Sequence, residues 1–147
     1  MSNREQGSVE PIEAAPRPID PGVRIGHVHL RTADIDRVKG FYCGVLGFDV
    51  VAEARGVPGW GTTGDILFVS AGGYHHHLGF NIWRGRGAPP VPAGVVGLRH
   101  WTIVLPAEAA AALRERVIAA GAPYEDTPEG LLVQDPWSIP LLVVAEG

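Results

Sequence analysis

The sequence predicts an α+β fold built from two paired β-α-β-β-β modules. Two stretches, GHVHL and RHWTI, each carry a histidine at the start of a strand-like run, and each run is followed by a helix-like segment and a glycine-containing turn. His27 and His100 are 73 residues apart and the glycines of the two turns are 74 apart, so the copies stay nearly in phase. One such unit is too small to bury its own core. We therefore expect the two units to pair into a curved, cup-like mixed sheet with helices outside.

Size and charge fit a single globular domain. The chain has 147 residues and a net charge of −4, without a basic stripe, so nucleic acid is not an expected partner. Its single cysteine excludes an intrachain disulfide and fits a reducing compartment. No apolar run approaches the ~20 residues of a membrane span, and the polar, acidic start does not resemble a secretory signal. These features predict a cytoplasmic protein without a membrane partner.

Local patterns set the expected boundaries. Residues 1–22 carry four prolines and no apolar period, which predicts a disordered or draped tail before a domain at 23–147. Module one is expected at about 23–84, a linker at 85–96 and module two at about 97–145. The expected elements of module one are strand Val23 to Thr32, a helix capped by Asp34 that runs to Leu46, and strands Phe48 to Ala52, Asp65 to Ser70 and His75 to Trp83. Those of module two are strand Leu98 to Leu105, helix Ala107 to Ala120, strands near Tyr124 and Leu131, and strand Ile139 to Ala145.

Strand alternation sorts the side chains into two faces. The apolar face, expected against the helices, holds Val28, Leu30, Leu78, Phe80, Ile82, Trp101 and Ile103. The other face, expected to line the cup, holds His27, His29, His75, His77, Gly79, Asn81, His100 and Thr102. His76 falls on the apolar side and is interpreted as structural. Histidines from three strands on one face indicate a metal centre between the modules.

These motifs resemble the vicinal oxygen chelate superfamily, which includes glyoxalases, bleomycin-resistance proteins and extradiol dioxygenases. GHVHLRTADIDRVKGFYCGVLGFDV is similar to the opening strand, helix and turn of that family. GGYHHHLGFNIW, a Pro-rich linker and GLRHW more narrowly resemble its catechol-2,3-dioxygenase-like branch. The resemblance covers about residues 23–145. It implies paired modules and a divalent metal, with Fe(II) favoured over Mn(II), Zn(II) or Ni(II).

The resemblance also implies the metal ligands. The first strand of each module supplies one, which falls on His27 and His100, and the fourth strand of module one supplies another, which falls on His77. His75 lies two residues from His77, on the same face of the expected strand, and could be the ligand in its place. The last strand of the family usually supplies a glutamate, but that position here is Leu142. This departure removes the carboxylate of the usual two-His-one-carboxylate triad.

The implied function is that of a metalloenzyme acting on a small substrate through two neighbouring oxygens. With Fe(II) and an aromatic, catecholic substrate it would be an extradiol ring-cleavage dioxygenase, with His29 or His75 as acid/base. Tyr74 either donates its phenol into the cup or simply closes the turn. Leu142 favours a glyoxalase-, epimerase- or lyase-like reaction through an enolate. A non-catalytic small-molecule binding (resistance) protein is the other alternative.

Two further expectations concern packing. Trp60, Trp83 and Trp137 either wall a pocket for an aromatic substrate or pack at the module edges. Uncovered sheet edges and apolar ends of the chain predict a homodimer.

Overall fold

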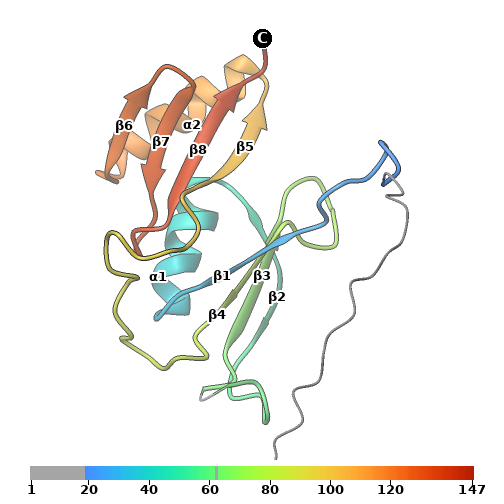
Figure 1. Cartoon of the computed structure of the whole chain (residues 1–147), viewed down its shortest axis with the longest axis vertical. Helices are drawn as coiled ribbons and strands as arrows, with labels where there is room; N and C mark the ends of the chain where they lie inside the picture. The colour runs from blue at the N-terminus through green and yellow to red at the C-terminus, as the bar shows by residue number, and fades with distance from the viewer. Residues whose placement is uncertain (1–18, 62) are drawn as a thin grey trace, which may run out of the picture.

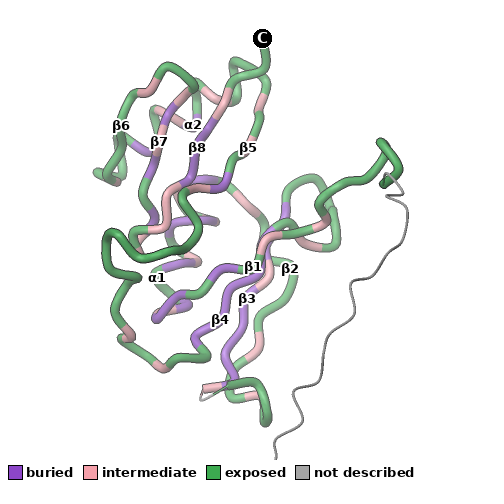
Figure 2. The backbone as a smooth tube through the Cα atoms, viewed as in Figure 1, coloured by how far each residue is buried: buried purple, intermediate pink, exposed green. Residues whose placement is uncertain are grey.

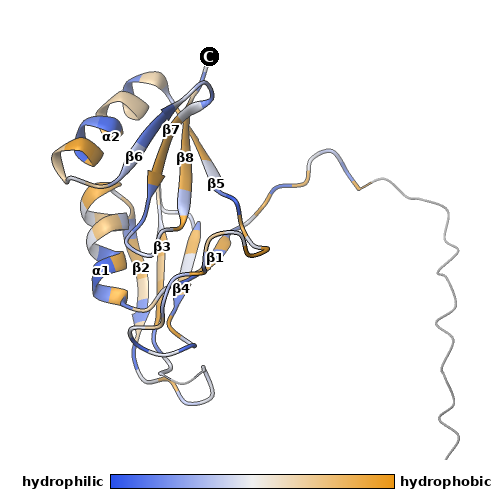
Figure 3. Cartoon of the chain, turned by 60° about the vertical axis from the view of Figure 1, so that its left-hand side comes forward, coloured by the Kyte–Doolittle hydropathy of each residue, from blue (hydrophilic) through white to orange (hydrophobic). Residues whose placement is uncertain are grey.

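Two four-stranded mixed sheets and two helical segments make up the protein, which confirms the predicted α+β fold of two β-α-β-β-β modules. This computed structural model describes residues 19–61 and 63–147. Of the predicted N-terminal tail, residues 1–18 therefore lie outside the described residues. Both helices lie on one side of the two sheets (Figure 3). No helix in the described parts of the chain is long and apolar enough to cross a membrane.

Module one forms a sheet in the order β1-β4-β3-β2. Its elements are β1 (Val28–Arg31), α1 (Ile35–Lys39), the π-helix η1 (Gly40–Val45), β2 (Asp49–Ala54), β3 (Ile66–Ser70) and β4 (Leu78–Asn81). β1 and β4 run parallel with Val28 opposite Leu78, while β3 is antiparallel to both β2 and β4. The two parallel strands therefore begin at the same end of the sheet.

The helix of module one begins as predicted and then changes its hydrogen bonding. The Asp34 carboxylate accepts a hydrogen bond from the backbone N–H of Arg37 at 3.0 Å, which caps α1. From Gly40 the helix widens into a π-helix, in which the Leu46 N–H bonds the carbonyl of Phe41. Gly47 follows with φ of 93°, a conformation that suits glycine and ends the helix.

Module two repeats the arrangement in the order β5-β8-β7-β6. Its elements are β5 (Trp101–Leu105), α2 (Ala107–Ala119), β6 (Tyr124–Thr127), β7 (Gly130–Gln134) and β8 (Pro140–Ala145). β5 and β8 are parallel, as β1 and β4 are in module one. The predicted helix at Ala107 to Ala120 and the last strand agree with the structure to within one residue at each end.

Three strands are shorter than the sequence predicts. β1, β4 and β5 begin at Val28, Leu78 and Trp101, so the histidines that precede them lie just outside the strands. Before β4 the chain turns through Gly72 and Gly73, whose positive φ angles are incompatible with an extended strand. Alternation therefore does not extend through the histidine run.

One apolar core joins both modules on the helix side (Figure 2). All seven residues predicted for the apolar face contribute to this core or pack against it. The Tyr42 hydroxyl donates a hydrogen bond to the buried Asp135 carboxylate at 2.9 Å, and the Arg116 guanidinium donates to the carbonyls of Val45 and Leu46. Because these contacts between modules involve the helices, the opposite face of each sheet is left uncovered by them.

Candidate metal and substrate site

The face of the first sheet that points away from the helices, called here the open face, carries His29, Gly79 and Phe68 side by side. Gly79 lets the His29 ring lie close against β4. A Cβ at position 79 would stand 3.0 Å from His29 Nδ1 and 3.1 Å from Phe68 Cε1, tighter than most real contacts. The absence of a side chain at residue 79 thus makes room for His29 on the open face.

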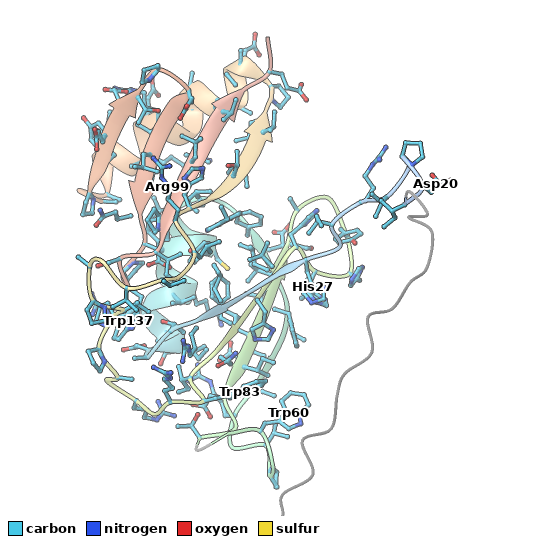
Figure 4. All side chains as sticks on the ribbon, in the orientation of Figure 1. Asp20, His27, Trp60, Trp83, Arg99 and Trp137 are labelled. Atoms are coloured by element: carbon cyan, nitrogen blue, oxygen red, sulfur yellow. The ribbon has the colours of Figure 1, made fainter. Side chains whose placement is uncertain are left out.

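Three histidines gather at the end of this sheet where β1 and β4 begin. One ring nitrogen from each of His27, His75 and His76 lies within 4.8 Å of the others. His27, labelled in Figure 4, comes directly before β1. The other two belong to the turn before β4. The parallel pairing of β1 and β4 brings these two chain segments together, since both strands start at the same end.

Aromatic rings pack around this histidine group. The His76 ring contacts those of His27, His75 and Phe68 at centroid distances of 4.4, 4.6 and 4.6 Å. Tyr74 lies between the rings of His75 and His77, at 4.2 and 4.5 Å. Its hydroxyl reaches the backbone next to His27, 3.5 Å from where a Cβ of Gly26 would be.

The histidine group fits a divalent transition metal. Imidazole nitrogens bind zinc at about 2.1 Å, which places neighbouring ligands about 3–3.5 Å apart. His27 and His75 are exposed, so their side chains have room to change rotamer. No carboxylate belongs to this group among the described residues, and neutral imidazoles suit Fe, Ni, Cu and Zn.

Burial and neighbouring imidazoles favour the neutral forms of His29 and His76. Burial lowers the pKa of His29, and His27 and His76 lower it further. Burial also lowers the pKa of His76, with added effects from His27 and His75. A neutral imidazole is the form that binds a metal or accepts a proton.

The structure brings some predicted residues together and leaves others apart. Of the predicted metal ligands, His27 is in the group and His77 and His100 are not. The Nδ1 of His77 instead accepts a hydrogen bond from the Ala71 backbone N–H at 3.2 Å. His75, predicted as acid/base or alternative ligand, joins the group. The ligand set His27, His77 and His100 stays a prediction.

His76 is the member of the group that sequence reasoning missed. Strand alternation assigned it to the apolar face, but its ring contacts His27 and Phe68 on the open face. The two glycines before Tyr74 were the available signal, because they interrupt the strand in which alternation holds.

Next to His29, the open face is hollowed into an open cavity of about 400 Å³. Its walls include Trp60 and Trp83, with Ile66 and His29 between them. The His29 ring lies 5.8 Å from that of Trp83. Trp60 and Trp83 lie close to each other in Figure 4, whereas Trp137 lies elsewhere, in the turn before β8. Two of the three predicted tryptophans thus line one cavity.

A buried carboxylate ties both walls of this cavity. Asp65 is 1% exposed and accepts hydrogen bonds from the Gly56 N–H, at the start of the Trp60 loop, and from Arg86, which follows Trp83. The loop also packs tightly on Trp83, since a Cβ at Gly61 would stand 2.5 Å from the Trp83 Cβ. Gly61 has φ of 68°, so both conformation and space require glycine there.

The profile of one protein family matches residues 24–134, and its description is glyoxalase/bleomycin resistance protein/dioxygenase superfamily. The chain belongs to this superfamily. A superfamily member from Bacillus subtilis (strain 168), named catechol-2,3-dioxygenase, is 47% identical over 115 residues, which cover 78% of this chain and 38% of that relative. The chain thus spans about two fifths of the length of this curated relative.

Solved structures of the superfamily share the fold. A glyoxylase/bleomycin resistance protein/dioxygenase domain from Frankia sp. EAN1pec has a TM-score of 0.65 and 21% identity, covering 85% of this chain and 98% of that one. The trypanothione-dependent glyoxalase I of Leishmania major has a TM-score of 0.64 and 21% identity, covering 84% and 87%. At this identity the likeness concerns the fold alone.

Leu142 is the position at which the resemblance implies a carboxylate ligand. Leu142 pairs with Thr102 and Leu132, while its neighbours Leu141 and Val143 pack in the core. It therefore lies on the sheet face away from the helices and is 6% exposed. The correspondence of Leu142 to the carboxylate position stays a prediction.

Proposed function

We propose that this protein is a metal-dependent enzyme that cleaves the ring of a small catecholic substrate. The observation that carries the proposal is that the aromatic cavity and the histidine group belong to the same sheet, with His29 lining the cavity and interacting with His27 and His76. The 47% identical relative named catechol-2,3-dioxygenase supports the same substrate class. His27 would be one of the residues that hold the metal. The metal supplies Lewis acidity that lowers the pKa of a substrate hydroxyl.

The side chains of the cavity divide the remaining work. Trp60 and Trp83 hold the substrate ring by stacking, and their partial exposure leaves the cavity open for entry. His29, between the cavity and the histidine group, accepts the proton of a substrate hydroxyl. Tyr74 has its hydroxyl near His27 and donates a hydrogen bond to a substrate oxygen.

Ring cleavage beside the two hydroxyls consumes one O2, and both oxygen atoms enter the product, so no separate reductant is needed. The test uses full-length protein loaded with Fe(II) without oxygen and then mixed with oxygenated buffer and a panel of catechols. One O2 consumed per ring-opened product is expected. Metal-loaded protein that binds catechols without consuming oxygen would contradict ring cleavage and would identify a binding protein.

Leu142 favours a second candidate. Without a carboxylate the ligands are neutral, and a metal with more net positive charge stabilises an enolate well. An isomerase or lyase acting through an enolate then fits the same cavity. Exchange of a substrate C–H for deuterium from solvent, without oxygen consumption, would favour this reaction over ring cleavage.

The protein also forms a homodimer in this proposal. The sheet faces away from the helices carry exposed apolar side chains such as Val104, which is 56% exposed on β5. Pairing with a second copy covers these side chains. The protein is expected to be cytoplasmic.

A further inference from the structure

The ends of β1 and β4 create a histidine group within module one alone. Val28 lies opposite Leu78 in the parallel pair, and the Val28 N–H bonds the carbonyl of His77. His27 therefore stands beside the turn that carries His75 and His76. No residue of module two takes part in the group.

The packing around the group holds the rings at this end of the sheet. Phe68 supports the His76 ring at 4.6 Å, and Tyr74 supports the His75 ring at 4.2 Å. His77 is tied back through Nδ1 to the Ala71 N–H. A hydrogen bond to the backbone of His75 involves the His76 ring. Each of His27, His75 and His76 still offers one ring nitrogen as a candidate ligand.

We infer that His27, His75 and His76 form an all-imidazole metal site contained in module one. This set differs from His27, His77 and His100, the set that the family resemblance implies, and it does not need the carboxylate that Leu142 replaces. Three neutral nitrogen donors favour late first-row divalent ions. The affinity for these ions rises from Mn(II) to Cu(II) and is lower again for Zn(II) than for Cu(II). Metal binding by this set rests on the histidine geometry and stands apart from the proposed ring cleavage.

The test measures metal binding by the full chain, freed of metal by a chelator, in competition with a chromophoric chelator. Zn(II) and Ni(II) should bind at least about tenfold more tightly than Mn(II). His27→Ala, His75→Ala and His76→Ala should each weaken Zn(II) binding by about 100-fold or more. The matched controls His77→Asn and His100→Ala should stay within about threefold of wild type, and circular dichroism checks that each variant is folded.

A second readout counts the nitrogen donors directly. Electron paramagnetic resonance of the Cu(II)-loaded chain should report coupling to three imidazole nitrogens, and to two in each of the His75→Ala and His76→Ala variants. Unchanged Zn(II) affinity in His75→Ala and His76→Ala, or a 100-fold loss in His77→Asn or His100→Ala, would overturn the site. Catechols left uncleaved by protein that binds Zn(II) as expected would contradict the proposed function and leave this site standing.

Discussion

Trp60 and Trp83 are the residues on which the proposed substrate class most directly depends. They face one cavity from two different segments, and Asp65 ties both segments at their base. Planar rings suit such a pair better than aliphatic ligands do, because stacking adds to the burial of apolar area. The aromatic nature of the proposed substrate follows from these two side chains.

Replacing either tryptophan should weaken binding of an aromatic ligand. Loss of one stacking partner costs about 0.5–1.5 kcal/mol, so Trp60→Ala and Trp83→Ala should each weaken 4-nitrocatechol binding about 2- to 12-fold. Absorbance titration of the metal-loaded protein measures this. Trp83→Phe should restore most of the affinity, and Trp137→Ala, outside the cavity, should change little. Equal losses in the Trp137 variant would show that the cavity is not the binding site.

His29 should control the rate of turnover rather than metal binding. It lines the cavity but is not a member of the histidine group, so His29→Gln should lower kcat by about 100-fold or more while Zn(II) affinity stays within about twofold of wild type. Steady-state kinetics and the chelator competition measure the two effects separately. A variant that keeps kcat within about threefold of wild type would remove His29 from the proposed proton transfer.

At the scale of elements, the buried carboxyl of Asp135 joins the modules. Its contribution to the free energy of unfolding depends on pH. It accepts hydrogen bonds from Tyr42 and from the N–H groups of Trp137 and Ile139. Burial nevertheless raises the pKa of its carboxyl, and the hydrogen bonds only partly oppose this rise. The ionised form therefore opposes folding.

The sign of the pH dependence follows from that raised pKa. Stability contributed by a carboxyl with a raised folded pKa is present at low pH and is lost as pH rises through the folded value. Relative to Asp135→Asn, the wild type should therefore lose free energy of unfolding as pH rises above about 4. Urea unfolding of both proteins at a series of pH values measures the gap between them. If the free energy of unfolding of the wild type rises relative to that of Asp135→Asn over this pH range, the raised pKa is contradicted.

The elements themselves were largely predictable from the sequence. Asp34 caps α1 as expected, and the apolar positions of β1, β4 and β5 pack in the core, because burial of one face forces period-two alternation inside a paired strand. His76 was placed wrongly because the same rule was carried beyond the strand into a turn. The switch to π-helical hydrogen bonding at Gly40 could not be predicted, because the six-residue segment is too short to show a distinct spacing of its apolar residues.

The arrangement of the whole molecule was less predictable. The repeat indicates two modules, but it does not say which side chains join them. In the structure, Tyr42, Asp135 and Arg116 join the modules on the helix side. The strands β1 and β5 are in separate sheets. The metal site expected between His27 and His100 depends on that arrangement, whereas the histidine group of module one depends only on neighbouring strands.

Dimerisation should follow from the uncovered sheet faces. Light scattering at micromolar concentration should give twice the 15.6 kDa mass of one chain. Val104→Glu, on the face of β5 away from the helices, should shift the protein to monomer because it places a charge in the buried interface. Ile118→Glu, at an exposed position on α2, is the matched control and should leave the dimer intact. A wild type of monomeric mass would reject the dimer.

The central claim is that one face of module one binds both the metal and the aromatic substrate. The most direct test compares 4-nitrocatechol affinity with and without Zn(II), in wild type and in His27→Ala. Zn(II) should tighten binding by at least about tenfold in wild type and should have no such effect in His27→Ala. Wild-type affinity that is the same with and without metal, or equal tightening in His27→Ala, would contradict it.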